Sequence, residues 1–201
     1  MASVLDVLVI GHSFVRRVDY HLRAKEQLNL LLPTRSHLVN MIGKGGAHVS
    51  DLMQLFNSRS SNPHLVIIDV GTNDLANLHT PSHVVARQLF SVARTLVERY
   101  GVEHVVLMEV LPRTTWGRHG APPSFTGRVK RFNDMIKSLV SHYKDRIPVS
   151  YWFHKGLASN IEGFIQDGVH LTPGGLAKYS RSLRRAIVKL GRGLRGNRHH
   201  V

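Results

Sequence analysis

Four short clusters of glycine and polar residues hold the side chains of this sequence that could do chemistry. They read Gly11-His12-Ser13, Gly43-Lys44-Gly45-Gly46, Gly71-Thr72-Asn73-Asp74 and Asp167-Gly168-Val169-His170. A serine hydroxyl is a weak nucleophile until a base takes its proton, and histidine is the side chain that most often serves as that base. Taken alone, Ser13 could instead cap a helix, and His170 could be an exposed residue in a turn. The choice depends on whether the four clusters meet in space.

The chain around these clusters alternates between strand-like and helix-like patterns. Apolar, β-branched runs predict strands at Leu5–Ile10, Leu38–Ile42, Leu65–Val70, Val105–Leu111 and Val149–Phe153. Amphipathic periodicity predicts helices at Val15–Leu28, Val49–Asn57, Ser82–Tyr100, Phe125–Tyr143 and Pro173–Leu190. This alternation favours a three-layer α/β/α domain with a doubly wound, five-stranded parallel sheet in flavodoxin-like order. Ligands bind at the carboxyl ends of such strands, so all four clusters are expected at one rim of the sheet.

The chain shows no internal repeat and no linker that would divide it. Residues 1–190 are therefore expected to form one domain, with residues 191–201 as a basic, flexible tail after Gly191. The Gly- and Pro-rich segment Arg113–Ser124 predicts a long loop, and such loops are often functional. Together with residues 152–164 it is expected to shape the substrate site. Core packing is the expected role of Trp152 and Phe153, whereas Trp116 and Phe125 could line an acyl or sugar site.

In their order along the chain the four clusters resemble the blocks of the SGNH (GDSL-type) hydrolase superfamily. The blocks of this superfamily supply a Ser, a Gly, an Asn and a His. Here they read GHSF, GKGGAH, GTND and DGVHLT, and they span nearly the whole chain. The pair formed by GTND and DGVHLT is the most specific part of the match. The resemblance implies the SGNH hydrolase fold and the hydrolysis of a carboxylic ester or acetyl group, with a small ester or acetylated compound as substrate.

The resemblance also implies a role for each residue. Ser13 would be the nucleophile, His170 its general base, and Asp167 the carboxylate that orients the imidazole and stabilises the imidazolium. The three-residue spacing lets the Asp167 side chain fold back to the ring of His170 within one turn. The oxyanion hole would consist of the backbone N–H groups of Ser13 and Gly46 and the amide of Asn73.

Three alternatives remain for these residues. Gly45 could replace Gly46 as the glycine of the oxyanion hole, although the spacing to Ala47 and Leu52 favours Gly46. The sequence GKGGAH could also cradle a phosphate before a helix, but it lacks the spacing of a P-loop. Asn73 could simply cap a turn after the third strand. No cofactor is expected, and no metal site is expected either, since no second ligand stands near His12 at suitable spacing.

His12 departs from the pattern of the superfamily, whose first block usually reads Gly-Asp-Ser. In the superfamily that Asp orients the serine turn and is not part of the triad. A histidine at this position could retune the site, or it could mark a domain that has lost catalysis. The sequence leaves both readings open.

The charge of the chain is strongly one-sided. The sequence has 27 Lys and Arg against 13 Asp and Glu, a net charge of +14 and a pI near 10.9. Residues 173–201 contain basic residues and no acidic ones. The candidates for binding nucleic acid there are Lys178, Arg181, Arg184, Arg185, Arg192 and Arg195. A solvated helix face followed by a frayed end explains the same pattern equally well.

The remaining composition bears on the compartment. The sequence has no cysteine, and no apolar run reaches the ~20 residues that span a membrane. The run from Val4 to Ile10 is short and interrupted by Asp6, which favours a strand over a signal peptide. An intracellular protein, cytoplasmic or nuclear, is expected.

Two functions from different classes fit these observations. The first is a serine esterase, favoured by the complete set Ser13, Asp167 and His170. The second is a nucleic-acid-binding module on the same fold with weak or no catalysis, favoured by the basic last helix. SGNH-like domains of both kinds are known. Some esterase-like ones occur within retrotransposon-encoded proteins, and this chain resembles them too.

Overall fold

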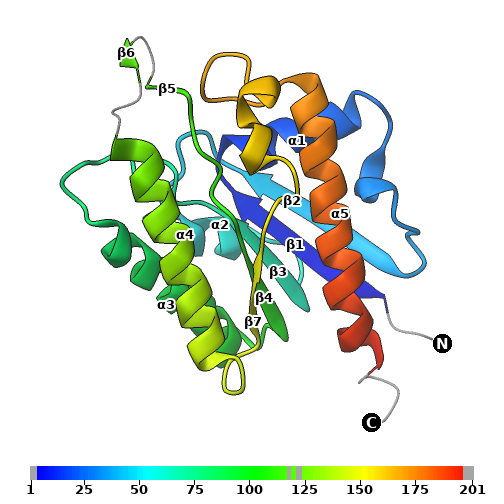
Figure 1. The fold of residues 1–201 in the computed structure, drawn as a ribbon. Coiled ribbons are helices and arrows are strands. Elements are labelled where there is room, and N and C mark those ends of the chain that lie inside the picture. Colours follow the sequence, from blue (N-terminus) through cyan, green and yellow to red (C-terminus); the bar gives the residue numbers. More distant parts are fainter. Residues whose placement is uncertain (1–3, 117–118, 121–123, 197–201) are drawn as a thin grey trace.

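Five parallel strands form the centre of the molecule, which we describe from a computed structural model of residues 4–116, 119–120 and 124–196 (Figure 1). The strands are β1 (Leu5–Gly11), β2 (His37–Gly43), β3 (Leu65–Asp69), β4 (His104–Met108) and β7 (Val149–Trp152). Their order in the sheet is β2-β1-β3-β4-β7, the flavodoxin-like order. The register pairs Gly11 with both Gly43 and Asp69, so the carboxyl ends of the three neighbouring strands lie level. The predicted fold class is confirmed.

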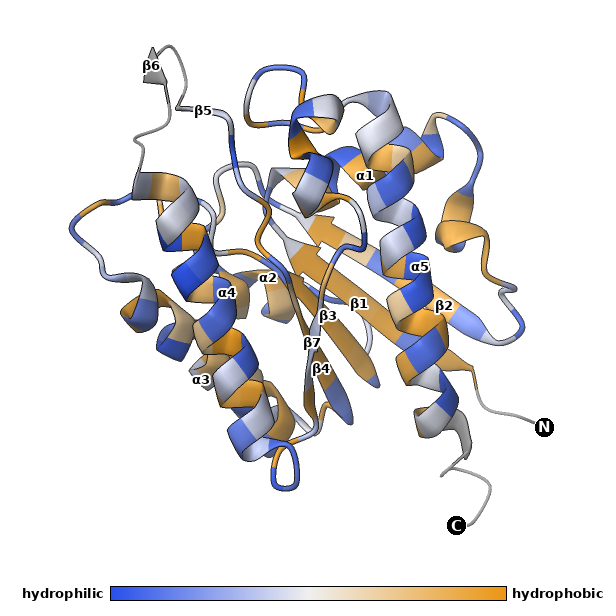
Figure 2. Cartoon of the chain, viewed as in Figure 1, coloured by the Kyte–Doolittle hydropathy of each residue, from blue (hydrophilic) through white to orange (hydrophobic). Residues whose placement is uncertain are grey.

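Helices cover both faces of the sheet, because successive side chains of a buried strand point to opposite faces. In β1, Leu8 and Ile10 belong to one core and Val7 and Val9 to the other. The first core is closed by α2 (Leu52–Asn57), α3 (Ser82–Tyr100) and α4 (Ser124–Tyr143), and the second by α1 (Ser13–Arg23) and α5 (Pro173–Gly196). Figure 2 shows the hydrophobic strands between helices whose outer faces are hydrophilic.

Short elements complete the description. They are the 3₁₀ turns η1 (Leu28–Leu31), η2 (Val49–Asp51) and η3 (Ala158–Phe164), and a two-stranded ribbon of β5 (Thr115–Trp116) and β6 (His119–Gly120). The ribbon occupies part of the predicted loop 113–124, of which residues 117–118 and 121–123 lie outside the described part. The first predicted helix ends five residues early, at Arg23.

The fourth strand is shorter than predicted, and one side chain explains why. β4 ends at Met108, whereas the apolar run continues to Leu111. The backbone N–H of Val110 donates to Asn133 Oδ1 (3.0 Å), and Asn133 Nδ2 donates to the Val110 carbonyl (2.9 Å). An asparagine of α4 therefore takes the place of a neighbouring strand at Val110. The last strand likewise ends one residue early, at Trp152, and Phe153 is 59% exposed, so its predicted core role is wrong.

The last helix is longer than predicted. Gly191 is not its stop, because α5 continues to Gly196. Gly191 is buried against β1, where a Cβ at this position would lie 2.4 Å from Leu5 Cδ2, and Leu194 still packs on the core. Packing of the apolar stripe thus stabilises α5 beyond Gly191, although glycine usually ends a helix. The boundary between domain and tail stays a prediction, since residues 197–201 lie outside the described part.

Over residues 4–116, 119–120 and 124–196, none of the helices combines the length and the apolar character that a membrane crossing needs.

Candidate active site

Ser13 stands at the point where β1 turns into α1. It is the first residue of that helix, and His12 is the N-cap, whose Nδ1 accepts a hydrogen bond from the Phe14 N–H (3.3 Å). The His12 N–H donates to the carbonyl of Asp69 at the end of β3 (3.0 Å). Ser13 therefore lies at the carboxyl rim of the sheet with its backbone N–H at a helix N-terminus, a position that favours negative charge.

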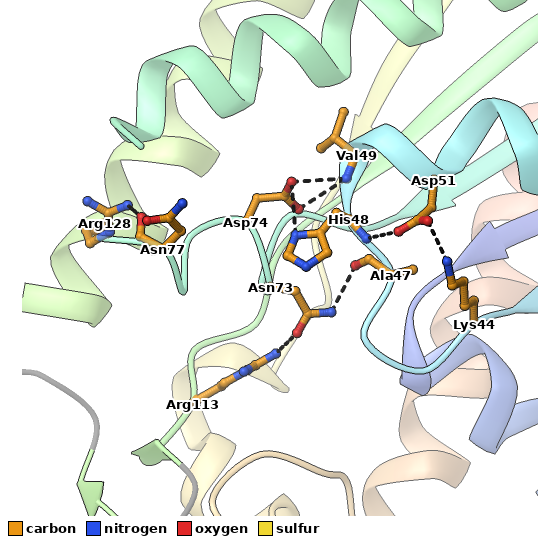
Figure 3. A network of polar contacts seen from close by, with 10 residues as sticks. All are labelled: Lys44, Ala47, His48, Val49, Asp51, Asn73, Asp74, Asn77, Arg113 and Arg128. Carbon is orange, nitrogen blue, oxygen red and sulfur yellow. Dashed lines mark hydrogen bonds and ion pairs between the residues drawn. The ribbon is translucent and has the colours of Figure 1, made fainter. Parts of the chain in front are cut away.

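The second and third clusters join the first through hydrogen bonds. The Lys44 N–H donates to the Gly11 carbonyl (2.9 Å), and Asn73 Nδ2 donates to the Ala47 carbonyl (2.9 Å; Figure 3). An amide nitrogen carries two donors, so one Asn73 N–H remains for another acceptor. Asp74 next to it is structural, because its carboxylate accepts the Val49 N–H at the start of the following turn.

Backbone conformation distinguishes the two candidate glycines. Gly46 has a φ of +72°, a region that favours glycine, whereas Gly45 lies outside that region. A Cβ on Gly46 would meet no heavy atom within 4 Å, so its surroundings are open and its constraint is conformational. This supports Gly46 over Gly45 as the glycine at the site.

Asp167 and His170 form a tight pair. The distance between Asp167 Oδ2 and His170 Nδ1 is 2.7 Å, and Asp167 Oδ1 also accepts the backbone N–H groups of Val169 (3.0 Å) and His170 (2.6 Å). Partial burial alone would raise the pKa of Asp167, but the His170 ring and these N–H groups outweigh it and lower the pKa to about 2. The carboxylate is thus charged at neutral pH and holds the proton of the ring on Nδ1, which leaves Nε2 to act as a base.

Arg113 connects the third cluster to the fourth. Its Nη2 donates to Asn73 Oδ1 (2.6 Å; Figure 3), and the next residues bind the turn of the fourth cluster, with the Thr114 N–H on the Gly168 carbonyl (2.9 Å). Burial lowers the pKa of Arg113, and the Asp167 carboxylate opposes this shift. Our sequence analysis did not include Arg113 in the site, although it follows the carboxyl end of a predicted strand by two residues. The rule that placed the other clusters at the rim would have found it.

The hydroxyl of Ser13 faces His12 rather than His170. Ser13 Oγ lies 3.5 Å from His12 Nδ1, and no hydrogen bond within the described residues joins Ser13 Oγ to His170. Catalytic hydrogen bonds often tighten only when substrate is bound. The lack of a hydrogen bond between Ser13 Oγ and His170 is therefore compatible with His170 as the base.

His12 has its own buried partner. Its ring is 2% exposed, and its Nε2 lies 3.4 Å from Asp69 Oδ1, whose other oxygen accepts a short hydrogen bond from the Tyr179 hydroxyl. Burial alone would raise the pKa of Asp69, but His12, His154 and Tyr179 together hold it below its ordinary value. The departure at His12 is therefore matched by a carboxylate at the end of the neighbouring strand.

Three of the predicted basic residues share one cavity. Lys178, Arg181 and Arg185 line a cavity beside β7, and Lys155 and Lys189, which the sequence analysis did not select, line it as well. Arg184 and Arg192 are exposed but lie outside this cavity, and of Arg195 only the helical backbone is described. In the part of the chain that is described, no group of three His, Asp or Glu side chains is placed to hold a metal ion.

Solved structures of low sequence identity share the fold. A candidate acylhydrolase from Bacteroides fragilis is 18% identical, with a TM-score of 0.71 over 94% of this chain and 91% of the other. A GDSL-like lipase from Bacteroides thetaiotaomicron is 18% identical, with a TM-score of 0.68 over 94% and 92% of the two chains. A catalytic mutant of an acetylxylan esterase from Geobacillus stearothermophilus is 17% identical, with a TM-score of 0.62 over 93% and 96%. No curated protein matches the sequence.

The model of one protein family matches most of the sequence. The match runs over residues 9–178, from the end of β1 into α5, and so includes all four clusters of the rim. The chain belongs to the GDSL-like lipase/acylhydrolase family.

Proposed function

We propose that this protein is a serine esterase that hydrolyses a carboxylic ester or an acetyl group through an acyl-enzyme. The observation that carries the proposal is the Asp167–His170 pair, which fixes one ring nitrogen and leaves the other as a base. This pair and Arg113, Asn73 and Ala47 form one connected framework at the rim where β1 ends in Ser13. Membership of a family of lipases and acylhydrolases supports the same chemistry.

The reaction assigns a task to each group. The Ser13 hydroxyl turns from His12 to His170, and Oγ attacks the acyl carbon while His170 Nε2 takes its proton. The resulting oxyanion accepts hydrogen bonds from the backbone N–H groups of Ser13 and Gly46 and from Asn73 Nδ2. His170 then gives its proton to the departing alcohol. Water, deprotonated by the same nitrogen, releases the acid and restores Ser13.

Arg113 fits this scheme as a positioning residue for Asn73. Because the guanidinium donates to Oδ1, the amide nitrogen of Asn73 must point away from Arg113, toward Ala47 and the proposed oxyanion. The fixed amide needs no rearrangement when charge develops, which is the feature that makes an oxyanion hole effective.

Hydrolysis of p-nitrophenyl acetate tests the proposal. Ser13→Ala is expected to lower kcat by about 10⁴-fold or more, and Asp167→Asn by about 10⁴-fold, because the ring then loses its tautomer. Ser91→Ala, on the exposed side of α3, is the matched control and should leave the rate unchanged. An organophosphonate should label Ser13, as read by mass spectrometry of the peptide. A wild-type protein that neither hydrolyses the ester nor takes the label at Ser13 would refute the proposal.

The second candidate function, nucleic-acid binding, concerns a different part of the molecule. The basic side chains of α5 that face β7 lie at the edge of the sheet, two strands away from β3 and Asn73. The residues that line this cavity include none of the proposed catalytic residues. We therefore treat binding as an addition to the esterase and not as its replacement.

A further inference from the structure

Beside β7 the molecule has a cavity with an aromatic wall and a rim of cations, which we call the basic groove. β7 is the edge strand of the sheet and runs between α4 and α5 (Figure 1). The cavity has a volume of about 440 Å³. Its aromatic wall consists of Trp152 and Phe153, and its cations are Lys155, Lys178, Arg181, Arg185 and Lys189. Tyr151 also borders the cavity, but its ring packs against the first core, on the other face of the sheet. We propose that the basic groove is a binding site for single-stranded nucleic acid.

The cations of the groove are arranged in a line. Lys178, Arg181, Arg185 and Lys189 recur every three or four residues and so share one face of α5. At 1.5 Å per residue, this row of cations extends about 16 Å along the helix. A single phosphate could contact one or two of them, whereas a row of this length matches the repeated charges of a polynucleotide backbone.

Most of these cations form no ion pair with acidic side chains of the described residues. No acidic residue is among those that line the groove, and in the described part of the chain no ion pair involves Arg181, Arg185 or Lys189. Lys178 differs, because its Nζ donates to the Gly156 carbonyl (2.6 Å) and lies 4.5 Å from the Phe164 ring. Lys189 Nζ lies 5.9 Å from the centre of the Trp152 ring, whereas no such ring contact involves Arg181 or Arg185 among the described residues. These cations can bind phosphates, whose neutralisation releases counterions and favours binding.

The aromatic wall supplies the second part of a nucleic-acid site. Phe153 is 59% exposed, although phenylalanine side chains are usually buried. Trp152 is fixed by a hydrogen bond from its Nε1 to Ser182 Oγ (3.1 Å), so the wall is held against α5. Bases of a single strand stack on such rings, whereas the bases of a duplex are already stacked on each other. An acidic peptide such as polyglutamate would use the cations but would have no ring to stack on Phe153.

Fluorescence anisotropy with a labelled 12-nucleotide single-stranded RNA tests this proposal. The groove variant combines Arg181→Gln, Arg185→Gln and Lys189→Gln. The matched control, Arg35→Gln, Arg87→Gln and Arg99→Gln, removes the same charge from exposed positions outside the groove. The slope of log affinity against log salt should become shallower by about 2 in the groove variant, at roughly 0.7 per phosphate contact in a single strand. The control should keep the slope of the wild type.

Further arms separate this site from simple charge attraction. Phe153→Ala keeps all cations and should weaken binding by roughly tenfold, the usual cost of losing one stacked base. Equal losses in the groove variant and in the control would overturn the proposal, as would unchanged affinity of Phe153→Ala. Polyglutamate or phosphatidylserine vesicles that compete equally well with the RNA would overturn it too, because neither can stack. Ser13→Ala should bind as the wild type does, so the result does not depend on the esterase. Circular dichroism checks that each variant is folded.

Discussion

At the scale of single residues, the ring of His12 and the carboxylate of Asp69 act as a pair. The superfamily usually has an Asp where this chain has His12, so the substitution His12→Asp would restore the common residue. In this chain it would also place a second carboxylate beside a buried one, since His12 Nε2 and Asp69 Oδ1 are 3.4 Å apart. An Asp side chain is shorter than that of His, but two carboxylates in one buried site cannot both ionise without cost.

We therefore expect that His12→Asp alone is harmful. The free energy of unfolding should fall by about 3 kcal/mol, the usual scale for an unpaired buried charge, and ester hydrolysis should fall with it. Asp69→Asn alone should also be destabilising, because His12 and Tyr179 lose their acceptor. The double variant should recover a large part of both losses. Urea unfolding of the four proteins measures this coupling, and purely additive effects would show that the two residues are not a pair.

His154 gives the stability of the protein a dependence on pH. Its ring is buried against Tyr179, with 4.9 Å between ring centroids, and burial lowers its pKa to about 4, although Asp69 opposes this shift. The unfolded chain takes up the proton near pH 6.5, whereas the folded protein does so only near pH 4. Unfolding thus binds one proton between these values, and stability falls as the pH drops from 6.5 to 4.

The expected loss from His154 is about 1.4 kcal/mol per pH unit in that window, and about 3 kcal/mol in total. Urea unfolding at several pH values between 7 and 4.5 measures it. In His154→Gln, the slope of the free energy of unfolding against pH should be smaller by the equivalent of about one proton. His83, an exposed histidine of α3, provides the control, and His83→Gln should keep the slope of the wild type. Identical slopes for the wild type and His154→Gln would contradict this account.

Part of the site could be predicted from residue types, and part could not. Ser13, Asn73, Asp167 and His170 could be proposed as site residues because they follow predicted strands or precede a predicted helix, in an order that resembles the SGNH blocks. Arg113 carries no motif, and its role depends on reaching an amide 40 positions away in the sequence. The partner of His12 was equally hidden, because Asp69 reads as an interruption in an apolar strand.

At the scale of elements, one side chain of α4 holds the segment that follows Asn73. Arg128 is 9% exposed and donates to the carbonyls of Leu75 (3.0 Å), Asn77 (2.8 Å) and Thr80 (2.6 Å; Figure 3 shows the contact with Asn77). These carbonyls belong to no helix or strand, and the guanidinium replaces the partners that such an element would give them.

The substitution Arg128→Ala is expected to lower the free energy of unfolding by at least about 3 kcal/mol, because these backbone carbonyls lose a charged donor. Since the segment that Arg128 holds follows Asn73 closely, kcat for ester hydrolysis should fall more than KM rises. Arg131→Ala, one turn along α4 and exposed, should stay within about 0.5 kcal/mol of the wild type. Urea unfolding measures the stability and steady-state kinetics measure kcat and KM. Equal effects of Arg128→Ala and Arg131→Ala would contradict the role given to Arg128.

The ends of elements show the limits of a periodic pattern. The pattern found every principal strand and helix, because burial on one or two faces dictates it. It placed the end of β4 too late, since the hydrogen bonds from Asn133 are invisible in the pattern. It also ended α5 too early, since Gly191 is a stop signal in general but here is the residue that lets the helix lie on Leu5.

At the scale of the whole molecule, the order of strands could be predicted and the surface between elements could not. Strand order follows from the alternation of elements and from right-handed crossovers. The basic groove instead arises from the contact of an edge strand with a helix, β7 with α5. Phe153 was expected in the core because its neighbours in the sequence are apolar. The ring remains exposed because Phe153 lies just past the end of β7, the edge strand of the sheet.

The contact between Leu5 and Gly191 determines how the molecule can be oriented. Leu5 begins β1, and the six residue steps to Gly11 carry the strand about 20 Å to the rim with Ser13, at 3.3 Å per step. The start of β1 and the end of α5 therefore lie on the side of the molecule opposite the rim (Figure 1). A linker attached near either end would fix the protein to a bead or a sensor chip with its catalytic side turned to the solution, so immobilised molecules would present one common face to their substrates.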